Sequence, residues 1–319
     1  MGVQRYTLPS GAVRYRARVK SQGREVATRV FDRRADAVAW EQDQRRRLRL
    51  GEWIDPRRGR VPLSAVATDW LGSRGSVKRR TRETDEAAWR NYIQPRFGNW
   101  PVASITAAEV SGWVGALVAR GLAPSTVTRA LATLRSVLAF AVADGRVQVN
   151  VAAAVRKPTS GRARRDGQAL TLDELWALTE ACKGRYRDVV PVLALDGLRW
   201  GELAGLQVGD RVRVPGPGLR LRRALLASSG GGSLFVDTLK NNRARTVPLV
   251  MDLVPIVDRW SIGKAPGAWL FEAPAGGPLR ESNWKRSVGW SGATAAIGLA
   301  GLRTRRSSTR TPSCTSGTR

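Results

Sequence analysis

The chain has 319 residues, which is enough for two or three domains with separate hydrophobic cores. Its 54 lysine and arginine residues against 26 aspartate and glutamate residues give a formal net charge of +28. Such a protein repels itself unless a polyanion neutralises the charge, and a nucleic acid best fits basic residues spread along the whole chain. An anionic membrane surface is a weaker alternative, because one basic amphipathic helix usually binds it, and a basic surface without any ligand is the other.

The same composition excludes several classes of site. Histidine is absent, which removes imidazole as an acid, a base or a metal ligand, and the two cysteines, Cys182 and Cys314, cannot form a zinc set or a disulfide framework. We therefore expect no metal ion and no cofactor. No uninterrupted apolar stretch is long enough to span a bilayer, and the first residues lack the apolar core of a signal peptide, so we expect a cytoplasmic protein without a membrane partner.

The first 57 residues have the pattern of a small sheet followed by a helix. Apolar and basic side chains alternate over 13–19, the alternation recurs over 26–30, and both runs are typical of strands. Gln22-Gly23 supplies a turn between them. Asp32 is a candidate N-cap for a helix that begins two residues later.

One face of the first strand in this module is basic. Arg16 and Arg18 alternate there with the apolar residues, so they point away from the expected core. We expect this face to lie against DNA, and a face that contacts only solvent is the alternative.

A polar segment with proline and glycine, 55–60, separates this module from a helical region. Apolar spacing and capping residues predict four helices, over 64–71, 84–93, 106–121 and 124–145. The second is expected to stop before Pro95, and a capping box formed by Thr106 and Glu109 opens the third. We expect one helical domain over 62–158.

Basic and hydroxyl side chains of this helical domain are candidate DNA contacts. Several of them lie off the apolar stripe of the longest helix, and others precede the second helix. The candidates are Lys78, Arg79, Arg80, Thr126, Arg129 and Arg135.

A second polar linker, 159–169, precedes the last region. Thr171 and Glu174 form another capping box, an apolar run covers 189–195, and Gly197 interrupts it before a short helix that begins at Arg199. Strands are expected over 219–221, 234–239 and 245–249. Asn241-Asn242 fits a hairpin turn that joins the last two, because asparagine tolerates positive φ.

The segment Ala-Leu-Asp-Gly-Leu-Arg-Trp-Gly-Glu-Leu-Ala-Gly-Leu at 194–206, followed by Asp210, resembles the first-arginine motif of the tyrosine recombinases, the phage-integrase family. In that family the arginine lies against the scissile DNA phosphate, so the resemblance implies this catalytic role for Arg199. A guanidinium suits it, because its planar donors bind two phosphate oxygens and its charge persists at any working pH. A surface arginine at a helix start is the alternative.

The segment 238–249 is similar to the family's β-hairpin lysine followed by Arg-Thr-Val-Pro-Leu. The resemblance implies that Lys240 lies at the tip of that hairpin and reaches the minor groove beside the cleaved bond. There its ammonium group would serve as the general acid for the leaving 5′-oxygen.

The resemblance covers about residues 1–304 and implies an α+β multidomain fold. Residues 1–57 are similar to the small sheet-and-helix module, three-stranded in many such integrases, that binds arm-type DNA sites. Residues 62–158 are similar to the helical, SAM-like core-binding domain. Residues 169–304 are similar to a mainly α catalytic domain with a small β-sheet, here truncated, and the segments 269–272, 277–286 and 300–304 resemble the approach to its second motif.

The resemblance ends after Thr304. The family continues with His-x-Leu-Arg-His and, further on, a nucleophilic tyrosine, whereas 305–319 hold neither histidine nor tyrosine. We expect this segment to be a disordered basic tail, because it has almost no apolar residue to bury. A shifted reading frame or a decayed gene would explain it, and a genuine basic tail is the alternative.

Together these patterns predict a site-specific DNA recombinase of the phage-integrase type, acting in DNA integration and recombination. It would bind double-stranded attachment-site DNA and self-associate on it. Without the second motif and the tyrosine, the chain as written is expected to bind DNA and not to cut it. The alternatives are a non-catalytic DNA-binding protein or regulator that occupies attachment sites, and a general basic nucleic-acid-binding protein.

Overall fold

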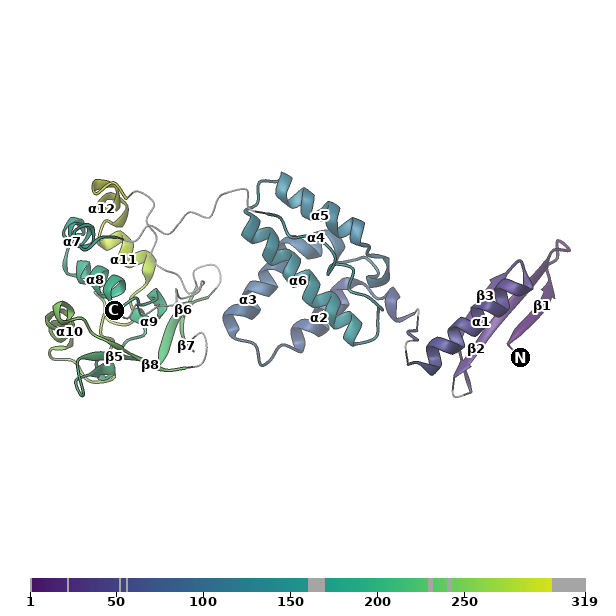
Figure 1. Ribbon diagram of the computed structural model, residues 1–319, viewed down its shortest axis with the longest axis horizontal. Coiled ribbons are helices and arrows are strands. Elements are labelled where there is room, and N and C mark those ends of the chain that lie inside the picture. The colour runs from purple at the N-terminus through teal and green to yellow at the C-terminus, as the bar shows by residue number, and fades with distance from the viewer. Residues whose placement is uncertain are drawn as a thin grey trace, which may run out of the picture. The chain divides into compact units, whose positions relative to one another are not determined.

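The computed structural model describes residues 2–21, 23–51, 53–55, 57–159, 170–228, 232–239 and 243–299. The chain divides into two compact units, Met1–Ala163 and Arg164–Arg319, and each is described by itself (Figure 1). Helices and small antiparallel sheets both occur, which confirms the α+β class.

The chain begins with a three-stranded antiparallel sheet and one helix. The strands are β1 (Val3–Thr7), β2 (Val13–Ser21) and β3 (Arg24–Phe31), and the helix is α1 (Arg34–Arg49). They pair in the order β1-β2-β3, and α1 lies along one face of the sheet (Figure 1). Ala17 and Val19 on that face are fully buried. The two strands predicted from alternation are therefore confirmed, and β1 is the strand that alternation did not reveal.

The prediction that Asp32 caps α1 is wrong. The N-cap is Arg33, whose side chain makes no capping hydrogen bond. Asp32 instead forms an ion pair with Arg14 on β2. The Asp32 carboxylate therefore pairs with a residue of a neighbouring strand and does not make the capping hydrogen bond that the sequence suggested.

Helices make up the next part of the first unit. They are α2 (Leu63–Gly72), α3 (Arg79–Ala88), a π-helical turn (Trp89–Ile93), α4 (Gln94–Phe97), α5 (Ala107–Ala119) and α6 (Pro124–Ala143), with short 3-10 turns at Arg58–Arg60 and Val102–Ser104. Their buried apolar residues form one hydrophobic core, and all of its buried members lie between Leu63 and Val155. The predicted capping box is present in part, because the Thr106 side chain accepts a hydrogen bond from the Glu109 N–H.

The helix predicted over 84–93 begins earlier and does not stop before Pro95. It starts at Arg79, and after the π-helical turn the chain continues as α4. Pro95 is the second residue of α4, and α4 directly follows the π-helical turn. The helical run therefore continues through Pro95 instead of ending before it.

Among the described residues, α6 is long and apolar enough to cross a bilayer by length and composition. The sequence analysis required an uninterrupted apolar stretch and predicted no candidate, because charged residues interrupt this one. The helix nevertheless meets the criterion of length and mean composition. Val127, Leu131, Leu134 and Leu138 are nearly or fully buried against α2, α3 and α5. The core of the helical region thus accounts for the apolar character of α6.

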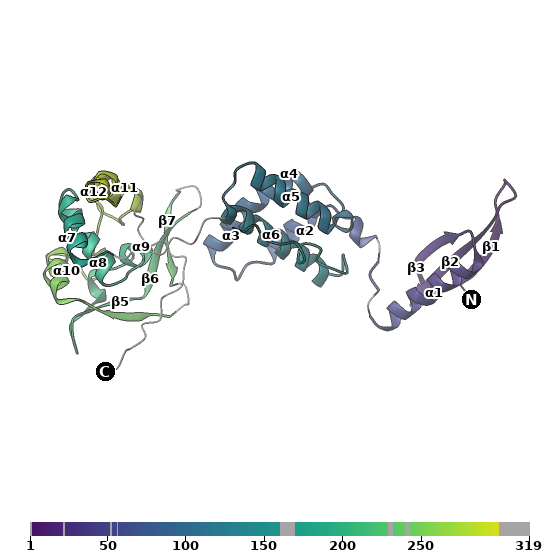
Figure 2. The same cartoon turned by 45° about the horizontal axis from the view of Figure 1, so that its top comes forward.

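In the part of the second unit that the structure describes, six helices are combined with two small sheets. The helices are α7 (Leu172–Ala181), α8 (Val189–Leu195), α9 (Trp200–Ala204), α10 (Val254–Ser261), α11 (Glu281–Ser287) and α12 (Trp290–Ala296), with 3-10 turns at Arg185–Asp188, Val208–Asp210 and Met251–Leu253. The strands are β4 (Arg211–Val212), β5 (Gly218–Leu221), β6 (Arg223–Ala227), β7 (Leu234–Thr238) and β8 (Arg245–Pro248). Figure 2 shows α7, α10, α11 and α12 gathered on one side, β6 and β7 on the other, and α9 between them.

The predicted pairing of the last two strands is wrong, although both strands exist. β8 pairs with β5, with Leu219 opposite Val247, and β7 pairs with β6, with Leu225 opposite Val236. Leu219, Leu221 and Leu225 are buried in the core of the unit. The strands therefore pair so that these leucines are buried, and Asn241-Asn242, the predicted turn, lies outside the described residues.

Tryptophans fill the centre of the second unit. Trp284 on α11 is fully buried and donates its indole N–H to the Tyr186 carbonyl. Its ring packs at a tilt against Trp200 and Trp290, with ring centroids 5.0 Å and 5.1 Å away. Trp200 is the first residue of α9. The cluster therefore ties the start of α9 to α11 and α12.

Candidate functional site

Arg199 lies at the N-terminus of α9, after a sharp change of direction. Gly197 has φ of +63°, a conformation that a residue with a side chain rarely adopts, and it separates α8 from α9. The backbone N–H of Arg199 donates to Glu202 Oε2 at 3.0 Å, and its Nη1 donates to Glu202 Oε1 at 2.8 Å. The side chain is 19 % exposed. One carboxylate thus fixes both the backbone and the guanidinium of Arg199.

Glu202 is the centre of the site, with a side chain that is 3 % exposed. Arg245, at the first position of β8, donates two parallel hydrogen bonds to it, from Nη1 to Oε1 at 3.0 Å and from Nη2 to Oε2 at 2.9 Å. Burial acts to raise the pKa of Glu202, but the hydrogen bonds from Arg245 and Arg199 outweigh it and hold that pKa below its ordinary value. Glu202 is therefore a charged carboxylate shared by two guanidinium groups.

The glycines of the motif allow α9 to lie directly on β6. A side chain at Gly201 would place its Cβ 2.9 Å from the Leu225 carbonyl oxygen, and one at Gly205 would place it 3.2 Å from the Arg223 carbonyl oxygen. The Arg-Trp-Gly-Glu-Leu-Ala-Gly pattern therefore has a packing reason at both glycines.

Asp210 fixes the other end of this segment. Its buried carboxylate accepts from Arg223 Nη1 at 2.6 Å, forms an ion pair with Arg222, and accepts the Gln207 N–H at 3.0 Å. The chain that follows α9 is thus anchored to β6.

The sequence predicted Arg199 as a site residue but did not predict Arg245. The signal was present in Arg-Thr-Val-Pro-Leu, whose first residue is Arg245, but only the tertiary structure brings it to Glu202, 43 positions earlier in the chain. Lys240 and the segments 300–304 and 305–319 lie outside the described residues.

In the first module, Arg16 and Arg18 lie on the face of β2 opposite α1, as predicted. They alternate with the buried Ala17 and Val19, and both are half-buried. The Arg16 guanidinium lies 4.8 Å from the centre of the Tyr6 ring, and Arg18 is 3.8 Å from the Glu25 carboxylate. This face of the sheet is therefore basic and carries one aromatic ring.

In the helical part, the candidate contacts fall into two groups. Lys78, Arg79 and Arg80 lie at the N-terminus of α3, where Arg79 pairs with Glu83 at 2.9 Å. Thr126 and Arg129 lie near the N-terminus of α6, half-buried and exposed respectively.

Arg135, the last candidate, is used within the domain. Its Nε donates to the Ala152 carbonyl at 3.0 Å and its Nη2 to the Val155 carbonyl, while Asn150 donates to the Arg135 carbonyl at 2.9 Å. It holds the segment after α6 against that helix. This is a structural use that helical spacing could not reveal.

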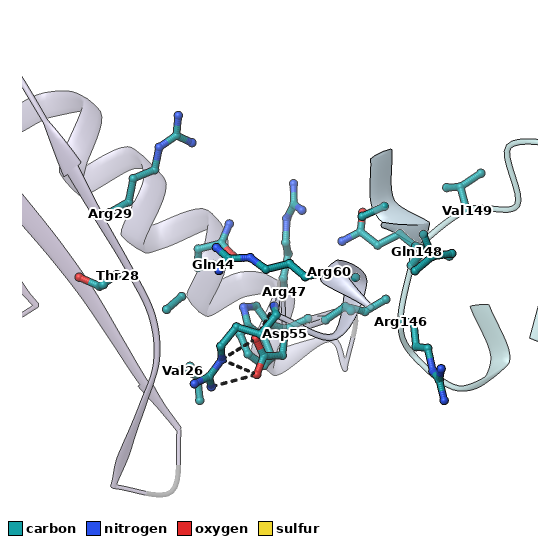
Figure 3. Close-up of a pocket in the computed structure, with 18 of the residues that line it drawn as sticks. Val26, Thr28, Arg29, Gln44, Arg47, Asp55, Arg60, Arg146, Gln148 and Val149 are labelled. Atoms are coloured by element: carbon teal, nitrogen blue, oxygen red, sulfur yellow. Dashed lines mark hydrogen bonds and ion pairs between the residues drawn. The ribbon is translucent and has the colours of Figure 1, made fainter. Parts of the chain in front are cut away.

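The segment predicted as the first linker contains a local ion pair. Asp55 accepts hydrogen bonds from the Arg57 backbone N–H at 2.9 Å and from its Nε at 3.1 Å, drawn as dashed lines in Figure 3. These bonds hold the pKa of Asp55 below its ordinary value. The pair orders the turn that precedes the 3-10 turn at Arg58–Arg60.

Comparison with known proteins decides the family. Residues 63–158 match the phage integrase central domain. The chain is 30 % identical over 273 residues to the integrase of Mycobacterium phage D29, an alignment that spans 82 % of this chain and 71 % of that integrase. The chain belongs to the phage integrase family of tyrosine recombinases.

Two solved structures share the fold of this family member. The Tn1549 transposon integrase, solved with circular intermediate DNA, superposes with a TM-score of 0.62 at 18 % identity, covering 78 % of this chain and 82 % of the other. The lambda integrase tetramer bound to a Holliday junction superposes with a TM-score of 0.55 at 19 % identity, covering 95 % and 85 %. The lambda alignment covers nearly the whole chain.

Proposed function

We propose that the chain is a site-specific DNA recombinase of the integrase type, which binds double-stranded attachment-site DNA and self-associates on it in the cytoplasm. The observation that carries the proposal is the Arg199–Glu202–Arg245 cluster, held rigidly between α9 and β8 in a chain of net charge +28. Two guanidinium groups around one carboxylate leave one net positive charge, which a DNA phosphate would neutralise.

The proposal assigns a separate task to each part of the chain. Residues 1–57 bind an arm-type site through the face that carries Arg16 and Arg18, and 62–158 bind the core site through α3 and α6. Residues 169–304 form the incomplete catalytic domain, in which Arg199 would lie against the scissile phosphate and Lys240 would be the general acid of the intact reaction. The segment 305–319 is a basic tail.

Recombination of this kind needs an oxygen nucleophile in line with the leaving 5′-oxygen. The tyrosines of this sequence are poorly suited to that task. Tyr186 donates its hydroxyl to the Glu272 carbonyl at 2.9 Å and is nearly buried, and Tyr6 stacks under Arg16. Tyr92 packs against the core of the helical part, and Tyr15 lies within β2. We therefore propose that these 319 residues bind DNA without forming a covalent intermediate.

A non-catalytic regulator that occupies attachment sites is the second candidate function. The hydrogen bond from the Tyr186 hydroxyl to the Glu272 carbonyl favours this candidate. A chain whose tyrosines are not nucleophiles would bind specific DNA without cutting it. Strand transfer after addition of a separate tyrosine-bearing subunit would favour the recombinase instead.

A salt titration tests DNA binding. The logarithm of the affinity of the full chain for duplex DNA, measured by fluorescence anisotropy, is expected to fall linearly with the logarithm of salt concentration, by about 0.9 for each phosphate contacted. A slope near zero would contradict the proposed function as a whole, and a steep slope with no preference among sequences would leave only a general nucleic-acid-binding protein.

A further inference from the structure

Glu202 creates an electrostatic problem for the site. Its carboxylate is 3 % exposed and lies 2.8 Å from Nη1 of Arg199. The pair formed by one guanidinium and one buried carboxylate has no net charge, so the pair attracts an incoming phosphate weakly. If Arg199 is to bind a phosphate, something else must compensate Glu202.

Arg245 provides that compensation. Its Nη1 and Nη2 bind the two oxygens of Glu202 in the fork geometry that matches a carboxylate best. Arg199 shares Oε1 with it through Nη1 alone. Among the described residues no acceptor takes up Nε or Nη2 of Arg199, so these donors stay available for a ligand.

We propose that Arg245 is a positioning residue: it holds Glu202 and compensates its charge, so that the cluster keeps a net positive charge and Arg199 keeps its remaining donors for a DNA phosphate. This inference rests on the proposed function. In this proposal Arg245 acts through Glu202 and not on the phosphate, because Glu202 occupies the guanidinium edge formed by its Nη1 and Nη2.

The backbone makes this arrangement rigid. Arg245 lies opposite Leu221 in the pairing of β8 with β5, and Leu221 is buried in the core. Glu202 lies on α9, whose glycines hold it against β6. The two partners thus come from elements whose positions the core sets.

The test measures which phosphates the protein contacts. The probe is the duplex that the wild-type full chain selects from a pool of random duplexes, with each phosphate replaced in turn by an uncharged methylphosphonate. Binding of the wild-type chain weakens at each contacted phosphate, and Arg199→Ala is expected to lose this response at one of them. Arg245→Ala is expected to lose the response at the same phosphate, with affinity for the unmodified duplex reduced about tenfold.

Matched variants separate positioning from general damage. Arg220→Ala removes an exposed arginine from the neighbouring strand β5 and should leave the response at that phosphate unchanged. The double variant Glu202→Gln with Arg245→Ala should recover much of the response, because the uncompensated carboxylate is gone. A purely structural role of Arg245 would give no such recovery.

Folding is checked by near-ultraviolet circular dichroism. If Arg245→Ala does not fold, Arg245→Lys takes its place, since lysine keeps the charge but cannot bridge both carboxylate oxygens. It should weaken the response at the Arg199 phosphate and leave the response at the others intact.

Besides the absence of recovery in the double variant, three results would overturn the inference. Arg245→Ala, or Arg245→Lys in its place, could keep the full response at the Arg199 phosphate, or could lose the response at a different phosphate, which would make Arg245 a direct contact. The third is an Arg199→Ala variant that keeps every response, which would also remove the proposed role of Arg199. Failure of the wild-type chain to select or bind any duplex would refute the proposed function itself, and the inference with it.

Discussion

The Asp196→Asn variant is expected to be more stable than the wild-type chain at neutral pH. Asp196 is 9 % exposed and follows α8 directly, so its charge lies at the negative end of that helix. Burial raises the pKa of Asp196 from 3.8 to about 6, and the approaching Val250 backbone N–H offsets only part of this effect. Neither carboxylate oxygen accepts a hydrogen bond of ordinary geometry from the described residues.

The size and sign of the effect follow from proton linkage. Because the folded-state pKa is the higher one, the folded chain binds the proton more tightly, and stability falls as pH rises from about 4 to about 6. The difference between 3.8 and about 6 corresponds to about 3 kcal/mol, and solvent access to the carboxyl reduces the expected effect to about 1–2 kcal/mol. Asparagine carries no charge, so the variant should lack this loss.

Urea unfolding of both chains at a series of pH values, followed by tryptophan fluorescence, measures the difference. The transition of the first unit serves as the internal reference, because the substitution lies in the second. The stability gain of the variant should be close to zero at about pH 4 and reach its full size above about pH 6.

Asp210→Asn is the matched control. Asp210 is also buried, but Arg222 and Arg223 compensate its charge, so its substitution should destabilise the second unit by about 3 kcal/mol at neutral pH. The reasoning is refuted if Asp196→Asn destabilises the chain at neutral pH, or if its effect does not change between about pH 4 and pH 7.

Four further predictions address the other parts of the chain. Arg135→Ala should lower the stability of the helical part by about 1–3 kcal/mol in urea unfolding. Arg129→Ala should leave that stability unchanged and weaken DNA binding. Equal stability of the two variants would contradict the structural use of Arg135. Trp284→Ala should destabilise the second unit by about 3–5 kcal/mol, and a loss below about 1 kcal/mol would mean that the tryptophan cluster contributes little. Removal of residues 1–57 should abolish footprinting on one class of site and preserve it on another, and loss of both would reject the proposed division of tasks. The 319-residue chain should form no covalent adduct with a nicked suicide substrate on a denaturing gel, and an adduct would show that one of its tyrosines is a nucleophile after all.

The sequence by itself determined the local elements and the family resemblance. Alternation predicted β2 and β3, the capping residues predicted α5 and α7, and the arginine motif placed Arg199 at a helix start. These features depend on residues within about four positions of one another, where the side-chain period and capping bonds act directly. For the same reason the predicted start of α6 at Pro124 is confirmed.

Only the tertiary structure decided which distant segments meet. The sequence predicted a hairpin of β7 and β8, but β8 pairs with β5 because that pairing buries Leu219 and Leu221 in the core. It is this pairing that brings Arg245 to Glu202. The choice of strand partners depends on how much apolar surface the whole unit can remove from water, and the spacing of residues along the chain does not contain that quantity. The pairing of buried charges follows from that choice.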